Sequence, residues 1–313
     1  MPRVADATSS SSPTPSRIIS VKPVVLSAPE RGDDLQVRVT APAVGTGLPI
    51  IVLAHGFGLA MDSYDPLVDF WAANGFVVVQ PTFLDSLTLG LTPADPRHAT
   101  IWRSRVDDLE HVIDELDAVV AAVPGLADRV DLDRLAVAGH SWGGQSVGML
   151  LGARVIGADG SPGADATDAR VKAGVLLATT GLGGADLTAF AQENFAFMSP
   201  DFDRLTTPTL VVAGDRDQSL LSTRGPDWFT DVYRQSPGAR SLLTVLGGEH
   251  SLGGIHAYRS ADTTDEDPAR VDVVRRITTA FLQQTLDVDS SAWERATAAL
   301  AASPNPAGRL DSR

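Results

Sequence analysis

A serine between two glycines is the clearest chemical pattern in this sequence. Residues 135–138 form an apolar run, Gly139-His140-Ser141-Trp142-Gly143 follows directly, and residues 145–151 have the composition of a helix. A G-x-S-x-G pattern at the turn from a buried strand into a helix is typical of a nucleophile elbow, which lifts the serine hydroxyl clear of the sheet. We therefore predict that Ser141 is a nucleophile. The N–H of Trp142, at the start of the helix, would then be free to face an oxyanion.

A serine nucleophile needs a base and an acid, because its hydroxyl is almost un-ionised at neutral pH. His250 follows the apolar run 241–246, and Asp217 follows another apolar run, 209–213. Sites in open α/β sheets lie outside the carboxyl ends of the strands, so these side chains should converge near Ser141. The chain order serine, acid, histidine fits the same arrangement. We therefore assign the base to His250 and the acid to Asp217.

Asp215 is the alternative acid. It lies two residues before Asp217, so on an extended segment the two side chains would share one face, and both cannot orient the same imidazole equally. We favour Asp217 and interpret Asp215 as an aspartate that stabilises a turn.

The sequence His55-Gly56-Phe57-Gly58 ends another buried apolar run, residues 48–54. Glycines let a backbone approach a substrate closely, so this loop is a candidate for the second half of an oxyanion hole. We assign the second donor to the N–H of Phe57, alongside that of Trp142. The rings of Phe57 and Trp142 could also line the substrate pocket, and core packing is an equally good interpretation for either ring.

The elements that must position these residues alternate between strands and helices. The predicted strands are 21–26, 35–40, 48–54, 76–80, 135–138, 171–178, 209–213 and 241–246. The predicted helices are 63–73, a long helix with an apolar stripe from Val106 to Val123, the helix after Ser141, and 270–286. This order, after an opening hairpin, predicts an α/β fold: a mostly parallel open sheet of about eight strands with helices on both faces.

The chain divides into a leader, one domain and a tail. We expect residues 1–20 to be a disordered leader, residues 21–286 to form the catalytic domain, and residues 287–313 to form a C-terminal helix and tail. The connection 179–208 begins with small or polar residues and continues with several phenylalanines. It is too short for a separate domain, so we predict no large cap, but one apolar helix over the cleft.

Composition narrows the possible chemistry and partners. The 313 residues include no cysteine, which excludes a disulfide, a thiol nucleophile and a zinc–thiolate site. The net charge of −14 argues against nucleic acid or an anionic membrane as a partner. Apolar runs stay shorter than the roughly 18 residues of a membrane span. Residues 1–16 lack the apolar core of a secretory signal, so we expect a cytoplasmic protein, or a secreted one if a signal peptide has been removed.

These residues together resemble the α/β-hydrolase superfamily over residues 21–286. Within it, the loops HGFG (55–58), GHSWGG (139–144) and GGEHSLGG (247–254) are similar to the chlorophyllase, cutinase-like and polyester-hydrolase branch, as are the segments QPTFLDS (80–86) and WRSRVDDL (102–109). The resemblance implies the α/β-hydrolase fold and a cofactor-free serine esterase that uses Ser141, His250 and Asp217. Its oxyanion amides would be those of Phe57 and Trp142, and its substrate a small-molecule or polymeric ester.

Several functions are compatible with such a site. We expect hydrolysis of carboxylic esters through an acyl-enzyme. An amidase or an acetylhydrolase would use the same triad. A non-catalytic binding member of the fold is a further alternative, although such relatives often lose a triad residue and all three positions are filled here. No metal-ligand motif such as H-E-x-x-H is present, so we predict neither a metal site nor a cofactor. The oligomeric state stays open.

Overall fold

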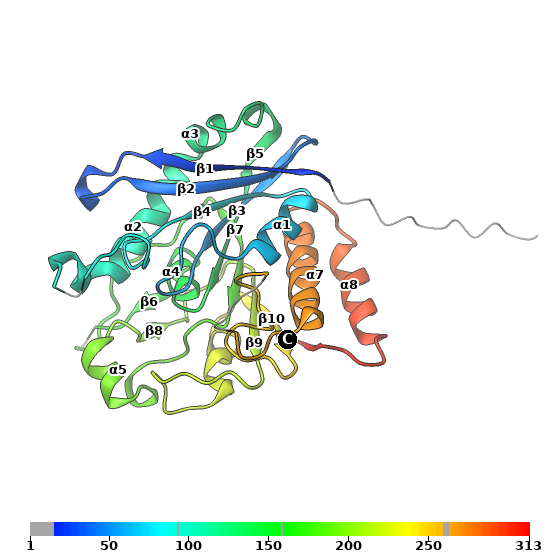
Figure 1. Cartoon of the computed structure of the whole chain (residues 1–313). Coiled ribbons are helices and arrows are strands. Elements are labelled where there is room, and N and C mark those ends of the chain that lie inside the picture. Colours follow the sequence, from blue (N-terminus) through cyan, green and yellow to red (C-terminus); the bar gives the residue numbers. More distant parts are fainter. Residues whose placement is uncertain (1–15, 93, 158, 259–262) are drawn as a thin grey trace, which may run out of the picture.

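A nine-stranded sheet forms the centre of this protein in the computed structural model, which describes residues 16–92, 94–157, 159–258 and 263–313 (Figure 1). The strand order is β1-β2-β4-β3-β5-β7-β9-β10-β11. The bounds are β1 Ile18–Leu26, β2 Leu35–Pro42, β3 Leu48–Ala54, β4 Val77–Pro81, β5 Val130–His140, β7 Val171–Leu177, β9 Thr209–Gly214, β10 Ala239–Val245 and β11 Gly308–Ser312. Neighbouring strands from β4 to β10 pair in parallel, whereas β1 with β2, β2 with β4, and β11 with β10 pair antiparallel. This confirms the predicted mostly parallel open sheet.

Helices cover both faces of the sheet. One face carries α1, α7 and α8, and the other carries α2, α3 and α4 (Figure 1). The bounds are α1 Asp65–Ala73, α2 Ile101–Asp114, α3 Leu116–Ala121, α4 Trp142–Leu150, α5 Ala189–Asn194, α6 Asp231–Gln235, α7 Pro268–Thr285 and α8 Ala292–Ala301. A small separate sheet pairs β6, Arg154–Val155, with β8, Pro200–Asp201.

Burial explains why the central strands were readable from the sequence. Every residue of β3 is buried, and its bounds agree with the predicted run 48–54. A parallel strand that is covered on both faces has no solvent-facing side, so it reads as a continuous apolar run. The strands β4 and β9 are likewise buried throughout, whereas β10 is continuously buried only from Leu242 onward. The boundaries of all three differ from the predicted ones by one or two residues.

The predicted long helix is two helices. It breaks between α2 and α3 at Glu115, whose φ of −100° and ψ of 15° depart from helical values. The apolar stripe from Val106 to Val123 nevertheless stays buried on both sides of the break. The stripe therefore predicted the buried face correctly but the continuity of the helix wrongly. The spacing of apolar residues does not reveal that one residue has non-helical dihedral angles.

Both ends of the chain extend the sheet further than predicted. β1 begins at Ile18, inside the predicted leader 1–20, while residues 1–15 of that leader lie outside the described residues. At the other end, β11 adds a ninth strand, in which Leu310 pairs with Leu243 of β10. The sequence reading missed β11 because Gly308-Arg309-Leu310-Asp311-Ser312 contains one large apolar residue, too few for an alternating pattern.

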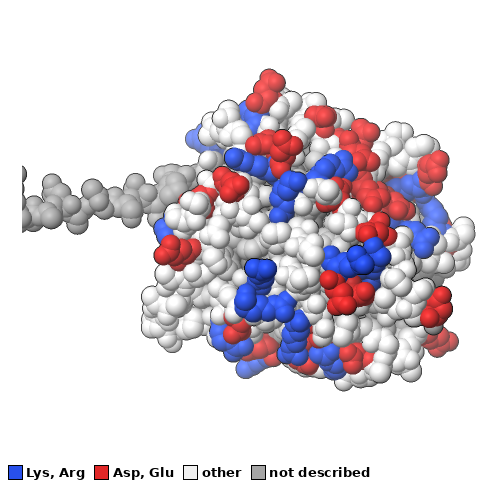
Figure 2. Space-filling model, turned by 180° about the vertical axis from the view of Figure 1, so that it is seen from behind, with Lys and Arg blue, Asp and Glu red and all other residues white. Residues whose placement is uncertain are grey.

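Charges of both signs are mixed over the surface. Figure 2 shows Lys and Arg side chains lying among Asp and Glu on the face seen from behind. Exposed or partly exposed ion pairs occur on the helices, for example between Arg276 and Asp272 on α7. None of the helices in the described parts of the chain is long and apolar enough to cross a membrane.

Candidate active site

The turn between β5 and α4 holds Ser141 in an unusual backbone conformation, with φ 56° and ψ −124°. Glycines on either side are required by close contacts. A Cβ at Gly139 would lie 2.3 Å from the carbonyl oxygen of Gly143, and a Cβ at Gly143 would lie 2.2 Å from that of Ala54. The N–H of Ser141 donates to the carbonyl of Leu177 at 2.9 Å, which fixes the turn to the end of β7. The local structure is thus the elbow that the motif predicted.

The loops after β9 and β10 bring an aspartate and a histidine to this serine. The Nε2 of His250 lies 2.8 Å from the Oγ of Ser141. The Nδ1 of the same ring lies 2.9 Å and 3.2 Å from the two carboxylate oxygens of Asp217. The structure therefore joins the three residues that the sequence placed after separate strands into one hydrogen-bonded chain.

Burial gives the two partners of Ser141 different environments. The side chain of Asp217 is fully buried, whereas that of His250 is 43% exposed. Burial raises the pKa of the Asp217 carboxyl, and the hydrogen bond and charge of the His250 ring partly offset that effect. A carboxylate that accepts the Nδ1–H leaves the lone pair of Nε2 directed at the serine hydroxyl, which is the tautomer that a base requires.

Asp215 has a different partner. Its carboxylate accepts a hydrogen bond of 2.6 Å from the backbone N–H of Gly247, in the loop after β10. Both carboxylate oxygens that contact His250 belong to Asp217. The structure thus places Asp215 as a link between the two loops and Asp217 as the residue against the imidazole.

The loop after β3 lies against the serine, and its Gly56 and Gly58 amides are hydrogen-bonded. A Cβ at Gly56 would lie 3.5 Å from the Cβ of Ser141, so loop and elbow are in contact. The N–H of Gly56 donates to the hydroxyl of Tyr64 at 2.9 Å, and that of Gly58 donates to Asp85 at 3.0 Å. The N–H of Phe57 between them has no acceptor within the described part of the chain.

The N–H of Trp142, at the first position of α4, likewise has no acceptor among the described residues. The first N–H groups of a helix have no partner inside it. Two backbone donors, those of Phe57 and Trp142, are therefore available on the two segments that meet at Ser141. These are the amides that the sequence assigned to an oxyanion hole.

A buried chain of hydrogen bonds connects three loops of the site. The hydroxyl of Tyr64, which accepts from Gly56, donates to Nδ1 of His140 at 2.9 Å. The Nε2–H of His140 donates to the carbonyl of His250 at 2.8 Å. His140 thus holds the backbone of the histidine loop to the elbow. Sequence reasoning missed Tyr64, because a tyrosine near the start of a helix carries no signal for this role.

Two buried histidines predict that the protein loses stability in acid. Burial lowers the pKa of His55 and that of His140 from 6.5 to about 3. In the unfolded chain these imidazoles bind protons at a higher pH than they do in the folded protein. Protonation therefore does not reduce the free energy of unfolding above pH 6.5, but it reduces it progressively as the pH falls from 6.5 toward about 3. Over that range each histidine should contribute about 1.4 kcal/mol per pH unit to the fall in unfolding free energy.

Urea unfolding measured at several pH values between about 7 and about 4 checks this expectation. His140→Gln should show a shallower dependence than the wild type, by about one proton, because glutamine does not titrate. His98→Gln is the matched control, since His98 is exposed on the surface, and it should keep the wild-type dependence. A His140→Gln protein with the wild-type slope would contradict the assignment of a neutral buried imidazole.

The two aromatic residues of the predicted site have different surroundings. The ring of Phe57 is 60% exposed, whereas Trp142 is only 6% exposed. Trp142 stacks on Phe197 at 5.4 Å between ring centroids, and Phe197 stacks in turn on Trp102 at 5.6 Å. The geometry therefore places the Phe57 ring where a substrate could contact it, and favours core packing for the ring of Trp142.

The connection between β7 and β9 supplies little cover for the site. It contains the short helix α5, the two-residue strand β8 and Phe197, which lies between the two indole rings. Phe190 on α5 is 59% exposed. The connection thus holds one helix, but α5 spans only six residues, of which Gln192, Glu193 and Asn194 are polar. That an apolar helix lies over the cleft stays a prediction.

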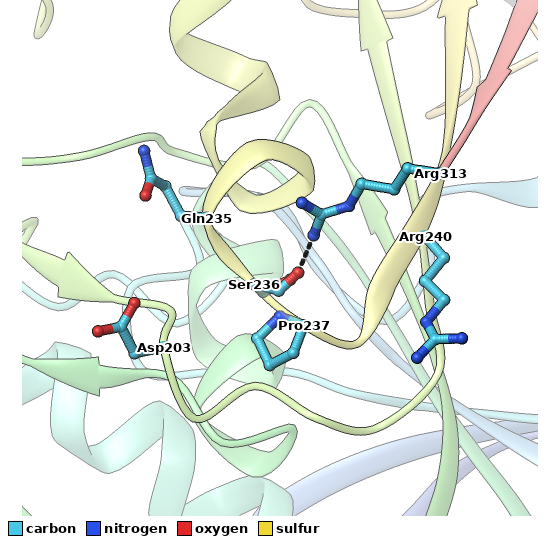
Figure 3. Close-up of a pocket in the computed structure, with 6 residues that line it drawn as sticks. All are labelled: Asp203, Gln235, Ser236, Pro237, Arg240 and Arg313. Carbon is cyan, nitrogen blue, oxygen red and sulfur yellow. Dashed lines mark hydrogen bonds between the residues drawn. The ribbon is translucent and has the colours of Figure 1, made fainter.

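A hollow lies at the end of the sheet opposite the carboxyl ends of the parallel strands. Figure 3 shows it at the amino ends of β9 and β10, lined by Asp203, Gln235, Ser236, Pro237, Arg240 and Arg313. The guanidinium of Arg313 donates to the carbonyl of Ser236 there, and to those of Arg234 and Ala239 at 3.2 Å. It completes the hydrogen bonds at the end of α6. Among the described residues, no cluster of three or more His, Asp or Glu side chains is arranged to hold a metal ion.

The mostly parallel sheet, the elbow and the covering helices define a protein of the α/β-hydrolase fold. Within that class, the chlorophyllase family model matches residues 17–154, which include the HGFG loop and Ser141. This match confirms the predicted resemblance to the chlorophyllase-like branch and indicates an ester hydrolase of the α/β-hydrolase type. Asp217 and His250 lie beyond the matched residues. No curated protein matches the sequence.

Proposed function

We propose that this protein is a serine esterase that hydrolyses carboxylic esters through an acyl-enzyme. The observation that carries the proposal is the unbroken hydrogen-bonded chain from Ser141 through His250 to Asp217. The free amides of Phe57 and Trp142, on the two segments that meet at the serine, support the same conclusion. A buried carboxylate, an imidazole and a serine hydroxyl in this order are the groups that acyl transfer requires.

In the first half of the reaction, the Oγ of Ser141 attacks the ester carbonyl carbon while His250 Nε2 accepts the hydroxyl proton. The carbonyl oxygen becomes an oxyanion, which the N–H groups of Phe57 and Trp142 stabilise. The imidazolium is stabilised by Asp217. When the tetrahedral intermediate collapses, His250 returns the proton to the leaving alcohol, and the acyl group remains on Ser141.

In the second half, water replaces the alcohol. His250 removes a proton from the water, which attacks the acyl carbon, and the same two amides stabilise the second oxyanion. The acid leaves when the proton passes to the Oγ of Ser141. The 43% exposed side chain of His250 is open to solvent, as the entry of this water requires.

We propose that the substrate is a small-molecule or polymeric ester. It would bind in a site that is open to solvent, and the protein would act in the cytoplasm. The partly exposed Ser141 and the exposed Phe57 support an open site. We expect a preference for short to medium acyl chains and no jump in rate when the substrate exceeds its solubility. A large mobile lid would be needed to shield a long apolar groove from water.

Initial rates with p-nitrophenyl butyrate and p-nitrophenyl palmitate, measured across the solubility limit of each, test this expectation. Butyrate should be hydrolysed faster, with ordinary saturation. A sharp rise above the limit, or a preference for palmitate, would show an interfacial site instead. The p-nitroanilide of the same butyryl group separates the esterase from an amidase, because faster cleavage of the anilide would favour the latter. Absence of turnover with any ester or amide would favour a binding protein.

A further inference from the structure

A buried ion pair lies directly beneath the loop that carries Phe57. Arg105 of α2 and Asp85 of the segment after β4 are both fully buried, and Nη1 of Arg105 lies 2.6 Å from Oδ1 of Asp85. The other oxygen of Asp85 accepts the N–H of Gly58 at 3.0 Å. Burial alone would raise the pKa of Asp85, but the interactions with Arg105, His55 and the N–H of Gly58 together outweigh it and hold that pKa below its ordinary value. The carboxylate is therefore charged where it binds the loop.

The rest of the guanidinium reaches both halves of the predicted oxyanion hole. Its Nη2 donates to the carbonyl of His55, and its Nε donates to Oγ of Ser146 at 3.1 Å. Ser146 on α4 donates in turn to the carbonyl of Trp142 at 3.0 Å. The guanidinium also lies 5.1 Å from the centroid of the Trp142 ring. One side chain thus contacts the HGFG loop and the first turn of α4 together.

These contacts hold the two peptide groups on either side of the Gly56–Phe57 peptide. The carbonyl of His55 belongs to the peptide before Gly56, and the N–H of Gly58 belongs to the peptide after Phe57. Between them lies the Gly56–Phe57 peptide, which carries the free N–H of Phe57. Because peptide groups are planar, fixing the two neighbours leaves the middle peptide little freedom to rotate.

From this geometry we infer that Arg105 and Asp85 are positioning residues, which hold the amides of Phe57 and Trp142 in the orientation that binds an oxyanion. The inference rests on the proposed esterase function. Neither side chain reaches the substrate, since both are fully buried. A buried ion pair is seldom more stable than apolar side chains of the same size, so stability alone gives a weak reason for such a pair under the loop.

The test compares two carboxylate-to-amide variants. Asp85→Asn keeps the shape but offers an NH2 group where either Gly58 or Arg105 needs an acceptor. Asp108→Asn is the matched control. Asp108 lies on α2, as Arg105 does, and forms a comparable buried ion pair with Arg31 at 2.9 Å. Arg31 and Asp108 make no hydrogen bond to the HGFG loop among the described residues. Asp85→Asn should lower kcat about 10- to 100-fold with KM within about threefold, while Asp108→Asn stays within about threefold in both.

Inhibitor binding separates positioning from a general structural effect. A boronic acid that forms a tetrahedral adduct on Ser141 should bind Asp85→Asn more weakly by the factor lost in kcat/KM, whereas a planar amide analogue of the substrate should bind unchanged. The pH profile of kcat/KM should keep its shape, because His250 and Asp217 are untouched. Arg105→Lys, which keeps the positive charge but cannot make all three contacts of the guanidinium, should fall between wild type and Asp85→Asn.

Two results would overturn the inference: equal kcat losses in Asp85→Asn and Asp108→Asn, or an equal loss of affinity for the tetrahedral and the planar inhibitor. Stoichiometric labelling of folded Asp85→Asn by an organophosphonate counts the competent sites, so that partial unfolding cannot imitate slower turnover. The same reagent applied to the wild type tests the proposed function by itself. A wild type that is neither labelled nor active would refute the esterase, independently of the comparison between variants.

Discussion

Ser141→Ala is expected to lower kcat by on the order of a millionfold while the fold stays intact, because it removes the one atom that forms the acyl-enzyme. Such a loss corresponds to about 8 kcal/mol of activation free energy. Within the described part of the chain, the hydroxyl makes one hydrogen bond, to His250, so we expect its removal to leave the surrounding loops in place. Steady-state rates with p-nitrophenyl butyrate, together with circular dichroism and the unfolding midpoint, measure both parts of the prediction.

Ser104→Ala is the control for this experiment, since the Ser104 hydroxyl donates to the carbonyl of Thr100 on the exterior of α2. It should retain wild-type activity. An organophosphonate should modify the wild type and Ser104→Ala at Ser141, and should leave Ser141→Ala unmodified. Substantial turnover by Ser141→Ala would place the nucleophile elsewhere and refute the proposed mechanism.

Asp217→Asn should cost about ten-thousandfold in kcat, because an amide in place of the carboxylate favours the wrong tautomer of the imidazole. With its NH2 group toward Nδ1, the asparagine would make Nδ1 an acceptor and put the proton on Nε2, where the base must receive one. Full burial of Asp217 prevents water from taking over the role of the carboxylate. KM should change little, since the residue does not contact the substrate.

Asp215→Asn provides the comparison within the same loop. The link from Asp215 to the N–H of Gly247 can be made by the oxygen of an asparagine, so this variant should lose less than about tenfold in kcat. Measuring both variants under the same conditions decides the assignment. If Asp215→Asn proved the more damaged enzyme, the acid would have to be reassigned, although Ser141 and His250 would keep their roles.

The sequence predicted the residues of the site where the chemistry demands a recognisable local pattern. Ser141 needs glycines at 139 and 143, because a side chain at either position would collide with backbone. His250 and Asp217 each follow a buried parallel strand, whose continuous apolar run is easy to find. Because parallel strands end at the same edge of the sheet, three local patterns were enough to predict one constellation.

The residues that support the site could not be found in this way. Tyr64, Asp85 and Arg105 act through contacts between segments that are far apart in the chain, such as the 2.6 Å pair between positions 85 and 105. A buried arginine and an exposed one look alike in a sequence. The strand β11 was missed for a related reason, since its pairing with β10 depends on backbone hydrogen bonds and requires little of the side chains.

The backbone of Ser141 has a consequence for selection and engineering. A φ of 56° is unfavourable for a residue with a Cβ, by about 1–3 kcal/mol, and is readily adopted by glycine. In the proposed mechanism, the nucleophile therefore occupies a position where an inactive glycine variant would be more stable. A library screened for heat resistance alone would accumulate glycine at position 141. A search for a more stable variant must therefore also select for turnover at every round. Gains in stability then have to come from residues outside the candidate site, such as those on the exterior helices.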